Sequence, residues 1–142
     1  MICLNVIEHV DDDRAALQHL RSALVPGGKA IVLVPQGPWN HGTLDEVLGH
    51  RRRYTKQALR SLAASCGFRV AELLEFNRVG TAAWLMNGKI LRRRSFGLGQ
   101  IFALNLLTPL LRALDRILPL PSLSLIAILE RTADGTSQAK AS

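Results

Sequence analysis

The chain has 142 residues, of which 48% are hydrophobic and 20% are charged. This composition excludes an intrinsically disordered chain, and the length suffices for one domain with its own core. The net charge of +7 is uneven, because residues 1–50 carry three basic and six acidic side chains, whereas residues 51–94 carry eleven basic and two acidic ones. Such a local field favours an anionic partner, either a phosphorylated substrate or acidic lipid head groups, and an ordinary solvated surface is the alternative. Aromatic residues make up only 5% and are not interleaved with the basic ones, which argues against nucleic acid.

The first 35 residues predict a β-α-β unit. Residues 2–7 and 29–35 are continuous apolar runs, as expected of strands buried on both faces. Between them, the three aspartates at 11–13 can cap a helix whose apolar residues recur at three- and four-residue spacing. The Pro-Gly-Gly turn at 26–28 ends that helix. Two such strands around one helix predict a right-handed parallel crossover.

Residues 36–54 predict a long loop at the carboxyl end of the second strand, where open α/β sheets bind their ligands. Thr55 can cap a further helix, and Gly67 ends it. Residues 68–76 predict a third strand, with Leu73 and Leu74 among its inward-facing residues.

The last part of the chain predicts two helices and one strand. Residues 80–94 predict an apolar helix that ends in three arginines and is broken by Gly97 and Gly99. A second, amphipathic helix over residues 101–118 is expected to kink at Pro109. Residues 122–129 predict a final strand, and residues 132–142 a disordered tail. No apolar stretch reaches the roughly 20 residues that span a bilayer, and a helix lying in the membrane interface is the alternative to one packed on the sheet.

The two cysteines, Cys3 and Cys66, lie in apolar segments without the spacing of a metal motif. We therefore expect buried free thiols and no metal site. No signal peptide is visible at the N-terminus, which predicts a cytoplasmic location, with or without peripheral membrane contact.

Several strings, taken in order, resemble one known family. The string Asn5-Val6-Ile7-Glu8-His9-Val10, the turn Leu-Val-Pro-Gly-Gly at 24–28 and the later run from Asp45 to Thr55 are similar to those of class I S-adenosylmethionine-dependent methyltransferases, in the type 11 or ubiquinone-biosynthesis-like branch. The resemblance covers residues 1–79 and 122–131. It implies an α/β fold with a Rossmann-like sheet in the order 3-2-1-4-5-7-6, in which strand 7 is antiparallel.

On that pattern the chain supplies strands 4, 5, 6 and 7, with a two-helix insertion at about residues 80–121. Residues 1–131 would then form one incomplete methyltransferase domain. Strands 1–3 have no counterpart, nor does the glycine-rich loop that carries the cofactor, since no G-x-G-x-G occurs. The resemblance thus implies the C-terminal part of a truncated enzyme that binds S-adenosyl-L-methionine poorly by itself. The exposed edge of strand 4 predicts self-association.

The resemblance also implies roles for individual residues. Asn5, Val6 and Glu8 would bind the cofactor. His9 would be catalytic, by holding substrate or assisting proton removal, because imidazole titrates near neutral pH; a capping hydrogen bond is the alternative. Substrate would be bound by five residues of the long loop: Trp39, His41, His50, Arg53 and Tyr54. The alternatives are a core plug for Trp39 and a solvated charge run for the arginines.

The function that this resemblance implies is transfer of a sulfonium methyl group to an O, N or C nucleophile. Proximity and orientation supply much of the rate of such a step. The acceptor would be a small molecule or lipid-linked, and the positive charge favours an anionic one. A non-catalytic module that binds protein or a membrane surface is one alternative, and a small basic membrane- or nucleic-acid-associated protein with an unrelated half-sheet is another.

Overall fold

The computed structural model describes residues 1–91, 97–117 and 119–133. In chain order its elements are β1 (Ile2–Leu4), α1 (Asp13–Ser22), β2 (Lys29–Pro35), the 3-10 helix η1 (Pro38–Asn40), α2 (Thr43–Leu48), α3 (Lys56–Ser65), β3 (Phe68–Phe76), α4 (Arg78–Trp84), the π-helix η2 (Leu85–Ile90), α5 (Leu98–Leu106), α6 (Thr108–Ile117) and β4 (Ser124–Arg131).

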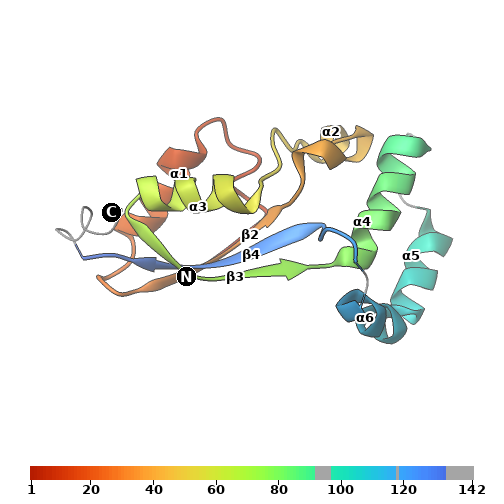
Figure 1. Ribbon diagram of the computed structural model, residues 1–142. Helices are drawn as coiled ribbons and strands as arrows, with labels where there is room; N and C mark the ends of the chain where they lie inside the picture. Colours follow the sequence, from red (N-terminus) through yellow and green to blue (C-terminus); the bar gives the residue numbers. More distant parts are fainter. Residues whose placement is uncertain (92–96, 118, 134–142) are drawn as a thin grey trace.

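The four strands form one mixed sheet in the order β1-β2-β4-β3. Strands β1 and β2 are parallel, and β4 runs antiparallel between β2 and β3. This order and these directions confirm the α/β, partial Rossmann-like arrangement 4-5-7-6 that the sequence predicts. Helices α1 and α3 cover one face of the sheet, whereas α4, α5 and α6 lie at one end of it (Figure 1).

Helices α1 and α3 form where their caps and apolar spacing predict them. The Asp12 carboxylate accepts the Ala15 N–H at 2.9 Å, and the Thr55 hydroxyl accepts the Ala58 N–H at 3.0 Å. Their inner faces bury Leu17 in α1 and Leu59 in α3 completely. Full burial of one such leucine stabilises the fold by about 1.5–3 kcal/mol, so these two contacts hold both helices on the sheet.

Only one face of the sheet is covered among the described residues, which corrects the expectation of strands buried on both faces. The residues that point toward α1 and α3 are fully buried: Ala30, Val32, Val34, Leu125, Ala127 and Leu129. The opposite face presents apolar side chains that are exposed, such as Ile2 and Leu4, or half-buried, such as Leu33 and Ile128. The continuous apolar runs of these strands are therefore not matched by a second layer of helices among the described residues.

Several element boundaries differ from the sequence prediction. Strand β1 ends at Leu4 because Asn5 adopts a positive φ of 51°, which turns the chain away from the sheet. The predicted long loop contains η1 and α2. In β3, Leu74 is 44% exposed rather than inward-facing, because a register shift between Val70 and Glu72 changes the alternation. The last strand lies two residues later than expected.

The segment between β3 and β4 has more helices than predicted. The expected kinked helix is two helices, since Pro109 lies in the first turn of α6, where its missing N–H costs no hydrogen bond. Gly99 lies inside α5 rather than before it. The three arginines at 92–94 and the tail from residue 134 lie outside the described residues. Within the described part of the chain, the helices are too short or too polar to cross a membrane.

Candidate functional site

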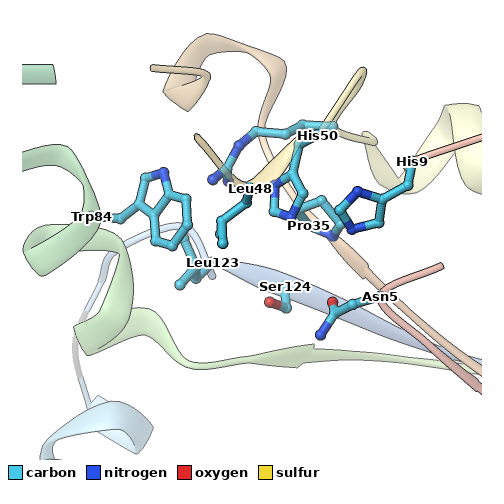
Figure 2. Close-up of a pocket in the computed structure, with 9 residues that line it drawn as sticks. Asn5, His9, Pro35, Leu48, His50, Trp84, Leu123 and Ser124 are labelled. Atoms are coloured by element: carbon cyan, nitrogen blue, oxygen red, sulfur yellow. The ribbon is translucent and has the colours of Figure 1, made fainter. Parts of the chain in front are cut away.

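A pocket of about 330 Å³ opens at the carboxyl ends of β1 and β2. This is the edge of an open α/β sheet at which ligands bind, and the volume is within the range of small-molecule sites. Figure 2 shows the side chains that line it. They come from the strand ends, the α2–α3 segment, α4 and the segment before β4: Asn5, His9, Pro35, Leu48, His50, Arg53, Trp84, Leu123 and Ser124.

Asn5 is brought into the pocket by its backbone conformation. Its φ of 51° lies in the left-handed region, which asparagine tolerates better than most residues. Its N–H donates to the Leu33 carbonyl at 3.0 Å, so the residue is still tied to β2 after β1 has ended. Figure 2 shows its amide next to Ser124 at the strand ends.

Asp45 is the electrostatic centre of the loop that covers the pocket. Its fully buried carboxylate accepts from His50 Nδ1 at 2.9 Å, Arg53 Nε at 2.7 Å, Trp84 Nε1 at 3.1 Å and the Gly42 N–H at 3.0 Å. Burial alone would raise the pKa of Asp45. The hydrogen bonds from His50 and Arg53 and the charge of Arg53 overcome that effect and hold the pKa well below its usual range.

His9 and His50 lie against each other, with ring centroids 4.9 Å apart. The Nδ1 atom of His9 is 3.1 Å from the Gly49 carbonyl oxygen, and that of His50 is 2.9 Å from the Asp45 carboxylate. Both partners are acceptors, so Nδ1 carries the proton in each ring and Nε2 has the lone pair when the ring is neutral. For His9, the sequence analysis left a capping hydrogen bond open as the alternative to a catalytic role. The bond to the Gly49 carbonyl is of that kind.

Glu8 lies next to these rings but is fully buried and is not part of the pocket wall. Neither of its carboxylate oxygens has a hydrogen-bond partner among the described residues. Burial raises the pKa of Glu8, and the nearby His50 and His9 rings partly offset this rise. The Nε2 atom of His9 lies 3.9 Å from Glu8 Oε1.

Arg51 and Arg52 attach the loop to the segment between β1 and α1, whereas Arg53 points into the loop itself. Arg51 pairs with Asp11 and donates from Nε to the His9 carbonyl, and Arg52 pairs with Asp13 at 3.0 Å. Arg53 is buried, with Nη1 donating to the Gln36 carbonyl at 2.9 Å and its guanidinium 5.0 Å from the Trp84 ring centroid. The interpretation as a solvated charge run is therefore wrong for Arg53.

Four of the nine predicted site residues line the pocket: Asn5, His9, His50 and Arg53. The structure places the other five away from the pocket wall. Val6 is half-exposed, and His41 Nε2 donates to the His50 carbonyl at 3.2 Å. Tyr54 is buried and donates to Asp13 at 2.7 Å, and burial together with that bond raises its pKa. Trp39 is 48% exposed, so its interpretation as a core plug is wrong.

Sequence reasoning missed Asp45 and Trp84 as site residues. Asp45 had a usable signal, since it stands three residues after Gly42 at the position where a carboxylate caps a helix start. Trp84 belongs to α4, and nothing in its local sequence indicates that the helix returns to the pocket.

Comparisons with known proteins agree with this geometry. A model of the methyltransferase domain family matches residues 1–73. A comparison with curated proteins gives no match. An S-adenosylmethionine-dependent methyltransferase from Mesorhizobium loti is similar, with a TM-score of 0.56 and 12% identity over 92% of this chain and 60% of that one.

Two further solved structures are similar at the same level. One is a protein of Bacillus halodurans C-125 designated a methyltransferase, with a TM-score of 0.54 and 13% identity over 93% of this chain and 68% of that one. The other is an S-adenosylmethionine-dependent methyltransferase from Archaeoglobus fulgidus, with a TM-score of 0.50 and 14% identity over 92% of this chain and 57% of that one. The chain thus spans 57–68% of the length of these three structures. At such identities the likeness shows the fold alone.

The sheet order β1-β2-β4-β3, with a pocket at the carboxyl ends of its parallel strands, defines a fold of the class I methyltransferase type. The family match extends over half of the sequence. The chain belongs to the methyltransferase domain family.

Proposed function

We propose that the pocket is part of the active site of an S-adenosylmethionine-dependent methyltransferase whose acceptor is a small molecule or a lipid-linked one. One observation carries this proposal. The segment that follows β1 presents Asn5 and His9 to a pocket at the carboxyl ends of the parallel strands, in a class I sheet order. Family membership and the fold support methyl transfer as the reaction.

The residues of the pocket fit one end of the cofactor. Asn5 offers an amide, and Leu48 and Trp84 supply apolar walls. The bound cofactor would supply an electrophilic methyl group on sulfur. The 142 residues contain no G-x-G-x-G sequence, so we propose that the chain by itself binds the cofactor weakly.

On the acceptor side, His9 would hold the nucleophile or take its proton through Nε2, since Nδ1 faces the Gly49 carbonyl. His50 and Arg53 form the adjacent wall, and both are held by Asp45. The positive balance of residues 51–94 supports an anionic acceptor. Rigid placement of these groups is the contribution that a methyl transfer needs most.

Titration with S-adenosylhomocysteine tests the proposal. At micromolar protein and ligand, calorimetry is expected to show little or no heat. At millimolar ligand, the NMR signals of Asn5, His9 and the Trp84 indole N–H are expected to shift, because these groups line the pocket.

The variant Asn5→Gly is expected to weaken these shifts, because glycine keeps the positive φ and removes only the amide. The matched control is Asn77→Gly, which also replaces an asparagine at positive φ but outside the pocket wall. Shifts that avoid the pocket, or equal effects of the two variants, would contradict the proposal.

A second candidate function is binding to an anionic membrane surface. The observation that favours it is a set of apolar side chains on α5, α6 and the end of η2 with the residue that follows it, each 50–76% exposed: Ile90, Leu91, Phe102, Leu106, Leu110 and Ile117. Exposed apolar groups of this number mark interaction sites. Lys89 and the three arginines at 92–94 lie in the same part of the sequence and would favour acidic head groups.

A further inference from the structure

Three potential metal ligands meet at the edge of the pocket. One ligand atom from each of Glu8, His9 and His50 lies within 4.8 Å of the other two. In a tetrahedral zinc site with bonds of 2.0–2.1 Å, neighbouring ligand atoms are about 3.4 Å apart. Small rotations of these side chains, of about 1 Å at the ligand atoms, would therefore suffice to bring them to bonding distance.

The hydrogen bonds behind the two histidines orient them for metal binding. The Gly49 carbonyl and the Asp45 carboxylate accept from the two Nδ1 atoms, so the Nε2 lone pairs are the ones left for a ligand. A histidine whose far nitrogen is held by a carboxylate or a carbonyl is the usual arrangement of protein metal ligands. His9 and His50 each have such a partner.

Glu8 provides an independent observation that points to a cation. Its side chain is fully buried, and both carboxylate oxygens lack a hydrogen-bond partner among the described residues. An unpartnered buried carboxylate is costly, and a bound cation removes that cost by accepting its lone pairs. The carboxylate lies on the side of the His9 Nε2 atom.

The nearby arginines do not oppose a cation at this position as strongly as their number suggests. Arg51 is paired with Asp11 on the exposed side of the loop, and Arg53 is paired with the buried Asp45. Each guanidinium therefore has a carboxylate that balances its charge.

We propose that Glu8, His9 and His50 bind a divalent transition-metal ion, with Zn²⁺ as the best match. Two imidazole nitrogens and one carboxylate oxygen suit Zn²⁺ or Co²⁺, whereas Mg²⁺ prefers an all-oxygen set. Because His9 and His50 line the pocket, an ion that they hold would be within reach of an oxygen ligand in the pocket. This proposal departs from the sequence analysis, which predicts no metal site.

The metal site does not depend on the proposed methyl transfer, and it is tested with metal alone. If the ion binds, His9 would hold an acceptor oxygen through the metal rather than take its proton directly. The S-adenosylhomocysteine titration and the metal titration can therefore succeed or fail separately.

The first test uses the unmodified 142-residue chain and Zn²⁺. Calorimetry is expected to show one equivalent bound. The imidazole nitrogen signals of His9 and His50 are expected to change on addition of Zn²⁺, whereas those of His19 and His41 stay in place. No binding by the folded chain, or changes confined to His19 and His41, would overturn the proposal.

The second test uses variants and Co²⁺, whose visible absorption reports its ligands. His9→Ala, His50→Ala and Glu8→Gln are each expected to weaken binding at least tenfold, and the control His19→Ala, in α1, is expected to leave it unchanged. Circular dichroism checks the fold of each variant. Thiolate-to-cobalt absorption bands would show that the cysteines bind the ion instead. Equal Co²⁺ affinity in all four variants would also contradict the proposed ligands.

Discussion

Asp45 is the single residue on which most of the pocket geometry depends. Its carboxylate holds His50, Arg53 and Trp84, which belong to three different parts of the chain. Because these partners are polar and largely buried, removal of the charge leaves a buried guanidinium without its counter-ion. The residue positions the pocket wall without lining the pocket itself.

The variant Asp45→Asn is expected to lower the free energy of unfolding by about 3 kcal/mol, since breaking a buried ion pair at one partner leaves an uncompensated charge. Urea unfolding measures this change. The matched control is Glu46→Gln, an exposed acidic residue in the same helix, for which a change within about 0.5 kcal/mol is expected. A loss below about 1 kcal/mol for Asp45→Asn would show that the network is not a major source of stability.

At the scale of elements, α4, η2, α5 and α6 differ from the rest of the molecule. Their contact with the sheet end leaves the apolar side chains described above exposed, and Figure 1 shows them standing apart from α1 and α3. By contrast, the apolar residues on the face of the sheet beneath α1 and α3 are fully buried. If the chain binds a membrane surface, these four helices are the elements that would contact it.

Co-sedimentation with vesicles measures this role. The chain is expected to bind vesicles that contain acidic lipids and to bind neutral vesicles less. The double variant Phe102→Ser and Leu106→Ser, and separately the replacement of the three arginines at 92–94 by glutamine, are each expected to reduce binding several-fold. Val25→Ser is the control, because Val25 is equally exposed but lies outside these helices. Binding that survives both sets of changes would rule out this surface.

At the scale of the whole molecule, the described residues cover one face of the sheet and leave the other open. The open face and the β1 edge carry Ile2, Leu4 and Ile31, and within the described part of the chain β1 pairs with β2 alone. An apolar edge strand with unpaired backbone groups is a template for a second chain. We propose that the self-association predicted from the sequence uses this surface.

Sedimentation velocity over a range of concentrations tests this surface. The chain is expected to form dimers or larger species as the concentration rises. Leu4→Lys is expected to shift the chain toward monomer, because a lysine at an edge opposes strand addition. Val25→Lys adds the same charge at an exposed site away from the sheet and serves as the control. A clean monomer at high concentration would contradict the prediction.

Local features of the sequence determined much of this fold. The N-caps Asp12 and Thr55 and the spacing of Leu17 and Leu59 act within a few residues of each other, so α1 and α3 could be predicted from them. The continuous apolar run of β2 is also a local feature, so this strand could be predicted in the same way. The ordered strings that resemble methyltransferases indicated the sheet order, which β1-β2-β4-β3 confirms.

Tertiary structure decided the rest, because the deciding contacts join residues far apart in the sequence. The bulge in β3 that exposes Leu74 depends on its pairing with β4. The pocket joins Asn5, Trp84 and Ser124, and no local pattern relates these three. Whether Glu8 finds a partner, and whether Arg53 is solvated or buried on Asp45, depends on which groups the folded chain brings beside them. The sequence by itself determined the family and the sheet, whereas long-range packing decided the chemistry available at the pocket.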